Sequence, residues 1–407
     1  MARIAFALEL GGELGHVRSC GGLGAALGLR GHRVAFLLSD LHSADAIPMT
    51  PREVMRLPFG TTAELALPAS YAEVLVGCGY RTAETLAPLA EAWRAQIAEW
   101  RPDIVVADYA PTAMLAARVL GIKCINYGMG FSVPPRLSPL PSFRFDEPVD
   151  PQRVASADAQ ALRSINAVLA AWGEKPLDTL SQLFECDEDF LCTFPELDHY
   201  GNRPPSGYWG PRFEISSGAR QAWPARGGKR IFLYLKTALP QLDAVIDFLA
   251  ASPHRVAAFI PGLDEARRAR LAGPARHVSL EPIRLEPLLD ECDLALTHGG
   301  QLTGGLASRG IPQLVFPLQF EQYITARRIE QLGCGQLLGP AAAPRQVAAA
   351  LADLLTNPSY AAAARSFSRR YPAFSIAEQR RRMVARIEQL ARGGPILAAS
   401  PRLGKPE

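Results

Sequence analysis

The chain reads Asp293-Leu-Ala-Leu-Thr-His-Gly-Gly-Gln-Leu-Thr303 at the point where a short apolar strand turns into a helix. Two adjacent glycines at this turn let the backbone approach a ligand, and a helix start presents N–H groups and the positive end of the helix dipole. A strand, a glycine turn and a helix in this order are typical of a parallel sheet with helices on its faces. The stretch therefore predicts an α/β fold with an anion site at the start of the helix.

The same alternation of short apolar strands and helices extends over the rest of the chain, on both sides of a segment rich in proline and glycine. The 407 residues are enough for two domains of similar size, each with its own core. We expect an N-terminal domain over 1–205, a linker over 206–228, a C-terminal domain over 229–374, and a final helix and tail over 375–407. The strands that we expect include Arg3–Leu8, Arg33–Leu38, Asp103–Ala107, Arg230–Leu235, Arg255–Ile260, His277–Leu280, Asp293–Thr297 and Gln313–Pro317.

The composition excludes several classes of protein. A formal net charge of +3 is too small for binding nucleic acid through bulk charge, and 48% hydrophobic with 20% charged residues excludes a disordered chain. The seven cysteines are scattered without a CxxC pair, and the histidines lack the spacing of metal ligands, so we expect no metal site. Because the sequence has no long uncharged apolar run and no signal peptide at its start, we expect a cytoplasmic protein without a membrane span, either a monomer or a homodimer.

A second glycine-rich turn, Gly11-Gly-Glu-Leu-Gly-His16, follows the first predicted strand and precedes a helix expected over Val17–Arg30. In an open parallel sheet such turns line the ligand crevice, and a histidine there titrates near neutrality and can act as a base. The glycines do not have GxGxxG spacing, so the turn gives little support to a dinucleotide site. From these residues alone, a functional His16 and an ordinary loop histidine are equally open.

The turn after residue 297 fits a diphosphate group. Gly299 and Gly300 allow close approach, His298 would donate a charge-assisted hydrogen bond, and Thr303 would add a hydroxyl in the first helical turn. The alternative is a tight turn in which Thr303 only caps the helix.

Several spaced segments of the C-terminal half together resemble the donor-binding signature of family 1 nucleotide-sugar glycosyltransferases. The N-terminal Gly15-His16-Val17 with Leu27–Val34 is similar to the opening of the acceptor domain in the same family. The resemblance covers essentially the whole chain and implies the GT-B architecture: two Rossmann-like domains with parallel sheets that face a cleft, and a last helix that returns to the N-terminal domain. The C-terminal segments are Thr297–Thr303, Gly310–Pro317, Glu321-Gln322 and Ala326–Gly333.

This resemblance implies an inverting transfer of a sugar from a nucleoside-diphosphate sugar to a hydroxyl group. His16 matches the family's general base, and Asp108 matches the carboxylate that orients the imidazole. The nucleotide sugar is a co-substrate, and no resident cofactor or metal is implied. The residues that match the diphosphate and donor-sugar contacts are His298, Gly299, Gly300, Thr303, Glu321 and Gln322.

The sequence also departs from the family's pattern. The glutamate that bonds the ribose hydroxyls is replaced by Gly305 or Leu306, depending on the alignment, which slightly favours a dTDP-linked over a UDP-linked donor because deoxyribose lacks the 2′-hydroxyl. The aromatic residue that stacks on the base is missing, so we expect backbone groups around Ile283 to bind the base. Lys236 stands where the family has small residues, and is either a cation facing the diphosphate or a solvated strand end.

The apolar loop 127–145 follows a strand that should end at the cleft, and we expect Tyr127, Met129 and Phe131 to line a pocket for a small, largely apolar acceptor. Ordinary packing is the alternative for this loop. Two other functions share the architecture: a non-catalytic partner protein, which has no need of the retained histidines and acidic residues, and a nucleotide-sugar epimerase, which has no need of an apolar acceptor loop. The amphipathic segment Ile376–Leu390 docks on the protein body or, alternatively, on a membrane surface.

Overall fold

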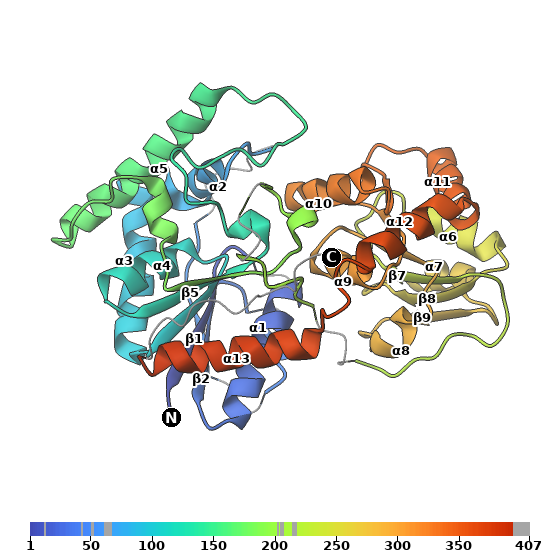
Figure 1. Ribbon diagram of the computed structural model, residues 1–407, viewed down its shortest axis with the longest axis horizontal. Helices are drawn as coiled ribbons and strands as arrows, with labels where there is room; N and C mark the ends of the chain where they lie inside the picture. The colour runs from blue at the N-terminus through green and yellow to red at the C-terminus, as the bar shows by residue number, and fades with distance from the viewer. Residues whose placement is uncertain are drawn as a thin grey trace. The chain divides into compact units, whose positions relative to one another are not determined.

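The computed structural model describes residues 1–11, 14–41, 44–49, 53–60, 67–201, 203, 207–213 and 218–393. The chain divides into two compact units (Figure 1). Unit 1 is Met1–Gly210 together with the C-terminal segment that begins at Ser375, and unit 2 is Pro211–Phe374. Gly12 and Glu13 of the predicted His16 turn, 204–206 and 214–217 around the predicted linker, and the predicted tail 394–407 lie outside the described residues.

Unit 1 is built on a sheet of six parallel strands in the order β3-β2-β1-β4-β5-β6. The strand order reverses at β1, which pairs with both β2 and β4, and ligands bind at the carboxyl ends of strands at such a reversal. Leu8 of β1 lies opposite Asp108 of β4, so the two strands end together. The strands are β1 (Arg3–Leu8), β2 (Arg33–Leu38), β3 (Glu53–Arg56), β4 (Ile104–Asp108), β5 (Lys123–Gly128) and β6 (Glu188–Leu191).

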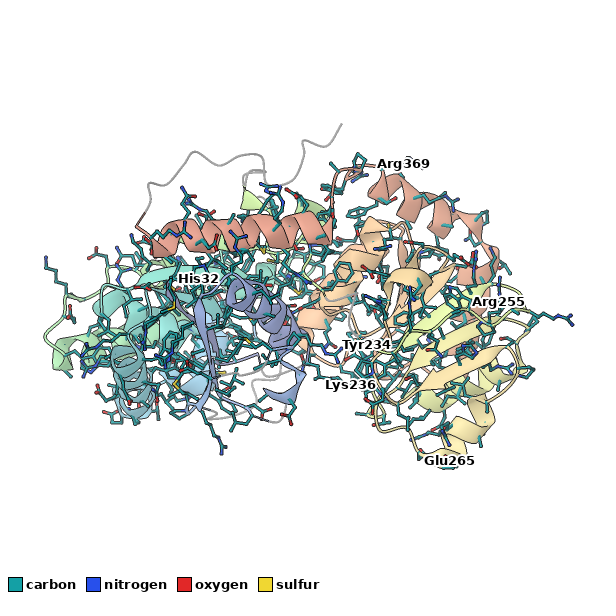
Figure 2. The ribbon with its side chains drawn as sticks, turned by 90° about the horizontal axis from the view of Figure 1, so that it is seen from below. His32, Tyr234, Lys236, Arg255, Glu265 and Arg369 are labelled. Atoms are coloured by element: carbon teal, nitrogen blue, oxygen red, sulfur yellow. The ribbon has the colours of Figure 1, made fainter. Side chains whose placement is uncertain are left out.

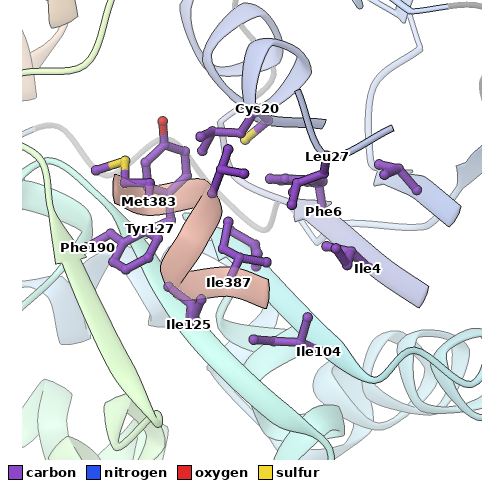
Figure 3. Close-up of a cluster of buried hydrophobic side chains, with 14 of the residues drawn as sticks. Ile4, Phe6, Cys20, Leu27, Ile104, Ile125, Tyr127, Phe190, Met383 and Ile387 are labelled. Carbon is purple, nitrogen blue, oxygen red and sulfur yellow. The ribbon is translucent and has the colours of Figure 1, made fainter. Parts of the chain in front are cut away.

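Alternate side chains of these strands face opposite sides of the sheet, as strand geometry requires. One face packs on α1 (Leu14–Leu29) and α13 (Ile376–Ala391) and forms an apolar core (Figure 3). The other face packs on α4 (Pro111–Val119), which contacts α3 (Ala83–Trp100). The remaining helical segments of unit 1 are η1 (Ala44–Ala46), α2 (Tyr71–Leu75), η2 (Val76–Tyr80), η3 (Gly130–Ser132), α5 (Pro151–Ala171), η4 (Leu180–Phe184) and η5 (Pro195–Leu197).

The last helix, α13, is held on unit 1 by a buried carboxylate in addition to its apolar face. Glu388 accepts two hydrogen bonds from the Arg30 guanidinium at 2.7 and 2.8 Å and one from His32 Nε2 at 2.8 Å. His32 lies directly beneath this helix (Figure 2), and its Nδ1 accepts the Ala2 N–H. Arg30 above all holds the pKa of Glu388 at about 2, so the anchor is ionised at neutral pH.

Unit 2 is built on a second parallel sheet, in the order β12-β11-β10-β7-β8-β9, with the reversal between β7 and β10. The predicted α/β class with two parallel sheets is therefore confirmed. Its strands are β7 (Arg230–Tyr234), β8 (Arg255–Phe259), β9 (Arg276–Ser279), β10 (Leu294–Thr297), β11 (Gln313–Val315) and β12 (Gly335–Leu337). Its helices are α6 (Leu242–Ala251), α7 (Glu265–Leu271), α8 (Glu286–Leu289), α9 (Gln301–Ser308), α10 (Phe320–Gln331), α11 (Pro344–Thr356) and α12 (Pro358–Ser368).

Across the described part of the chain, the helices are too short or too polar to cross a bilayer. Within the same residues, His, Cys, Asp and Glu side chains nowhere gather in a group of three or more that would hold a metal ion.

Candidate functional site

His16 and Asp108 meet where β1 and β4 end. Helix α1 begins at Leu14, three residues before the predicted start, so His16 lies in its first turn and the prediction of a loop position is wrong. The His16 Nδ1 and Asp108 Oδ1 atoms are 2.9 Å apart. The Asp108 side chain is fully buried, whereas 15% of the His16 side chain is exposed. Asp108 thus holds His16 from the buried side, while part of the imidazole remains exposed.

This geometry sets the chemistry of the imidazole. Because a buried carboxylate accepts the Nδ1–H proton, the lone pair of His16 lies on Nε2. An imidazole held in this tautomer can take a proton, and the carboxylate then stabilises the imidazolium that forms. The His16–Asp108 pair therefore has the arrangement of a general base with its orienting partner.

A group of packed rings includes Tyr109, the residue that follows Asp108 in the chain. Phe131 lies at its centre, with ring centroids 4.9 Å from Phe143, 5.9 Å from Tyr109 and 6.4 Å from Tyr71. Tyr109 directly follows Asp108 in the chain and is the partly exposed member. The cluster is thus linked to the His16–Asp108 pair through the chain at Tyr109. We call Tyr71, Tyr109, Phe131, Phe143 and Phe184 the aromatic cluster.

A buried carboxyl group at the same sheet edge was not predicted. Glu9 directly follows β1 and is 1% exposed. Its side chain accepts the Thr112 N–H at 2.8 Å and the Thr112 hydroxyl, which is also bonded to the Tyr80 hydroxyl at 2.7 Å. Burial raises the pKa of Glu9 to about 7, although the bonds from Thr112 oppose this rise. The sequence feature that could have revealed this buried carboxyl group is an acidic residue directly after a predicted strand.

In unit 2, His298 follows β10 and is held at both ring nitrogens by the main chain. Its Nδ1–H donates to the Phe316 carbonyl at 2.7 Å, and its Nε2 accepts the Lys236 N–H at 2.8 Å. The imidazole therefore ties together the ends of β10, β7 and β11. The expectation that His298 donates to a phosphate differs from this arrangement, because such a contact would first have to replace one of these two bonds.

The turn that follows His298 requires glycine at position 299. Gly299 has φ +89°, and a Cβ there would lie 2.6 Å from the Gln322 carbonyl oxygen, so only glycine fits. Helix α9 begins after Gly300 without a side-chain cap. The Thr303 hydroxyl is fully buried and, among the described residues, has no hydrogen-bond partner, which disagrees with the alternative of a capping threonine. The donor contacts of these residues stay predictions.

The backbone N–H and C=O groups of Ile283 point away from Ala219, the residue with which Ile283 forms a β-bridge. Ala219 bonds on both sides of this residue, through its N–H to the Pro282 carbonyl at 2.9 Å and through its carbonyl to the Arg284 N–H at 2.9 Å. In such a bridge the N–H and C=O of the central residue point to the opposite side. Within the described part of the chain, neither group of Ile283 forms a hydrogen bond. The residue thus offers one donor and one acceptor, as binding of a nucleobase requires.

Three further residues predicted to bind the nucleotide-sugar donor lie near the carboxyl ends of strands of unit 2. Lys236 follows β7 and is half-buried, close to Tyr234 (Figure 2). Glu321 and Gln322 occupy the first turn of α10, where Glu321 is partly exposed. Gln322 is buried, and its Oε1 accepts the Leu318 N–H at 2.9 Å. Gln322 therefore braces the turn before its helix, and only its amide nitrogen can still donate to a ligand.

The fold of the chain is that of known glycosyltransferases. The calicheamicin glycosyltransferase CalG4 matches with a TM-score of 0.68 and 19% sequence identity, over 98% of this chain and 100% of that chain. The spinosyn rhamnosyltransferase SpnG matches in its complex with thymidine diphosphate (TM-score 0.64, 19% identity) and in its complex with spinosyn aglycone (TM-score 0.65, 20% identity). Each SpnG match covers 96% of this chain and 100% of that chain. These matches show the GT-B fold.

Sequence comparison then decides the family. Residues 243–373 match the family described as "Erythromycin biosynthesis protein CIII-like, C-terminal domain". L-demethylnoviosyl transferase from Streptomyces niveus is 28% identical over 349 residues, which make up 79% of this chain and 82% of that protein. The chain is a glycosyltransferase. Its resemblance to the family 1 enzymes is confirmed by these matches.

The structure places two of the residues predicted to line the acceptor pocket, Tyr127 and Met129, and contradicts the prediction for Tyr127. The Tyr127 side chain lies in the core between the sheet and α13, with Phe190 at a centroid distance of 6.3 Å (Figure 3). The structure thus contradicts an acceptor-pocket position for Tyr127, because strand alternation points it to the face opposite the aromatic cluster. Met129 is 7% exposed and precedes η3.

The two positions at which a ribose-binding carboxylate could stand are enclosed by neighbouring side chains. A Cβ on Gly305 would overlap the Phe213 ring, and Leu306 is fully buried. Neither position therefore has room for an acidic side chain that reaches a ligand, which agrees with the departure seen in the sequence.

Proposed function

We propose that this glycosyltransferase is an inverting enzyme that moves a sugar from a deoxythymidine-diphosphate-linked donor to a hydroxyl of a small, largely apolar acceptor. The observation that carries the proposal is the hydrogen bond between His16 Nδ1 and the buried Asp108, next to the partly exposed Tyr109. A base that is oriented by a carboxylate and adjoins apolar rings suits an acceptor with one reactive hydroxyl on an apolar body.

In the proposed reaction, His16 Nε2 takes the proton of the acceptor hydroxyl while the hydroxyl oxygen attacks the anomeric carbon of the donor sugar. The bond between that carbon and the diphosphate oxygen breaks, and the nucleoside diphosphate leaves with the electron pair. One displacement inverts the configuration at the anomeric carbon. General-base catalysis of this kind contributes about 10²–10⁴-fold, and Asp108 stabilises the imidazolium formed.

The leaving diphosphate carries negative charge that the protein must balance. In the proposal, the start of α9 donates N–H groups, Thr303 donates its buried hydroxyl, and Lys236 supplies a positive charge. Glu321 and the amide nitrogen of Gln322 bind the hydroxyls of the donor sugar. The proposal includes no resident metal or cofactor.

The preference for deoxythymidine over uridine rests on the ribose contacts. Gly305 and Leu306 offer no carboxylate for a 2′-hydroxyl, whereas the donor and acceptor of the Ile283 backbone suit thymine and uracil equally. The relative SpnG was crystallised with thymidine diphosphate, which supports the same choice. Calorimetry with dTDP and UDP should give tighter binding of dTDP. Equal affinities would remove this part of the proposal.

The acceptor class is supported by the aromatic cluster and by the relatives. Phe131 and Tyr109 pack with ring centroids 5.9 Å apart, Tyr109 follows Asp108 in the chain, and the relative SpnG is known in complex with spinosyn aglycone. Tyr109→Ala should raise the KM for an apolar acceptor and leave the affinity for dTDP unchanged. If donor affinity fell equally, Tyr109 would have a structural rather than an acceptor-binding role.

The decisive experiment compares His16→Ala, Asp108→Asn and a matched control. We expect His16→Ala to lower kcat at least about 100-fold, and Asp108→Asn to lower it less, while both bind dTDP as the wild type does. The control is His277→Ala, because that imidazole only bonds the Ala222 carbonyl in unit 2. NMR of the product should show inversion at the anomeric carbon. Full turnover by His16→Ala, or retention of configuration, would overturn the mechanism.

A further inference from the structure

The second oxygen of the Asp108 carboxylate has its own donor. Oδ1 bonds His16, whereas Oδ2 accepts a hydrogen bond from the Cys20 thiol, with a sulfur-to-oxygen distance of 3.4 Å. Cys20 is four residues after His16 on α1, so the two side chains lie on the same face of the helix, one turn apart. One helix face therefore presents two donors to one carboxylate.

Both partners of this second bond are completely buried. Asp108 and Cys20 each have an exposed fraction of 0%, and Cys20 belongs to the apolar core of unit 1. A buried carboxylate oxygen without a donor is costly, and the bond from the thiol adds a restraint on rotation of the carboxylate about its last side-chain bond. The thiol is a weak donor, so it fixes the carboxylate without neutralising much of its charge. The charge thus remains available to the imidazolium.

We propose that Cys20 is a positioning residue of the catalytic pair. Its thiol holds Asp108 in the rotamer in which Oδ1 faces His16 Nδ1, and it thereby keeps the imidazole in the tautomer with a basic Nε2. This inference rests on the proposed role of His16 as the general base. Cys20 itself touches neither substrate in this assignment, and it acts only through Asp108.

Removal of the thiol should therefore weaken catalysis and leave donor binding intact. We expect Cys20→Ala to lower kcat about tenfold, which is the rate effect of one lost hydrogen bond to a charged group, with an unchanged affinity for dTDP. Cys20→Ser restores a donor and should recover most of the rate.

The control for a mere packing effect is Cys192→Ala. Cys192 is a second buried thiol of the same core, but its sulfur bonds the Phe190 carbonyl instead of a carboxylate. We expect this variant to keep the wild-type kcat and pH profile. Equal losses in Cys20→Ala and Cys192→Ala would show that only core packing matters, and would overturn the proposal.

A double-mutant cycle separates this inference from the proposed function. In the Asp108→Asn background, Cys20→Ala should have almost no further effect on kcat, because the thiol acts only through the carboxylate. An additive loss would refute the positioning role. If His16→Ala is inactive but Cys20→Ala turns over normally, this inference fails while the general base stands; full activity of His16→Ala would instead remove the proposed function itself.

Discussion

Glu9→Gln should make the stability of unit 1 less dependent on pH. Burial raises the pKa of Glu9 from 4.5 to about 7 in the folded protein. Between these two pH values the folded chain keeps a proton that the unfolded chain releases, so the free energy of unfolding decreases as pH rises. The difference between 4.5 and about 7, at roughly 1.4 kcal/mol per pH unit, amounts to about 3 kcal/mol. This contribution is complete below pH 4.5 and lost above pH 7.

The glutamine side chain tests this argument because it has the shape of the acid and no ionisable proton. Its amide can accept the Thr112 N–H and donate to the Thr112 hydroxyl, so the contacts of Glu9 are largely kept. We expect the variant to gain about 3 kcal/mol relative to the wild type when the pH is raised from about 4.5 to 8. Other titrating groups cancel in this difference.

Urea unfolding followed by tryptophan fluorescence measures the effect in the right part of the chain. Four of the five tryptophans belong to unit 1. The control is Glu174→Gln, at an exposed position of the same unit, which should follow the wild type at every pH. If Glu9→Gln also kept the pH dependence of the wild type, the carboxyl would not be desolvated and the argument would be refuted. The four residues are Trp93, Trp100, Trp172 and Trp209.

Three further outcomes are expected. Glu388→Gln should lower the free energy of unfolding of unit 1 by about 1 kcal/mol at pH 7, a small value because Arg30 is half exposed. Since the pKa of Glu388 lies at about 2, this difference between variant and wild type should vanish in urea titrations as pH falls from 4.5 toward 2. Gly299→Ala should weaken dTDP binding in calorimetry at least about tenfold, because the added Cβ meets the Gln322 carbonyl at a left-handed φ. EDTA should leave the transfer rate unchanged, and a loss restored by Mg²⁺ would contradict the proposed charge balance.

The strands that were predicted lie within two residues of the observed ones, but β3, β6, β12 and the start of α1 were missed. Glycines before His16 and within the helix lower its intrinsic propensity, which made a longer loop the natural prediction. In the structure these glycines allow close packing: a Cβ on Gly24 would lie 2.6 Å from the Phe36 ring of β2. The helix is therefore stabilised by contact with the sheet, and local propensity is overridden by a contact between residues distant in sequence.

The pairing of His16 with Asp108 was implied by the family resemblance, whereas their supporting contacts could not be predicted. The Cys20 thiol and the Glu9 carboxyl are placed by the approach of α1 and α4 to the sheet. Tyr127 was misplaced for a related reason. Alternation along β5 fixes that Tyr127 and Asn126 face opposite sides, but the sequence does not say which side carries the apolar helices.

The two histidines at the strand reversals show how environment decides the role of a residue. His16 lies after β1 and His298 after β10, and each of these strands borders the reversal in the strand order of its own sheet. A carboxylate accepts a hydrogen bond from Nδ1 of His16 and leaves the lone pair on Nε2, whereas main-chain groups bond both nitrogens of His298. The sequence shows only that a histidine follows an apolar strand in both places. The partner of Nδ1 differs: it is the Asp108 carboxylate for His16, which suits the proposed role of a base, and the Phe316 carbonyl for His298.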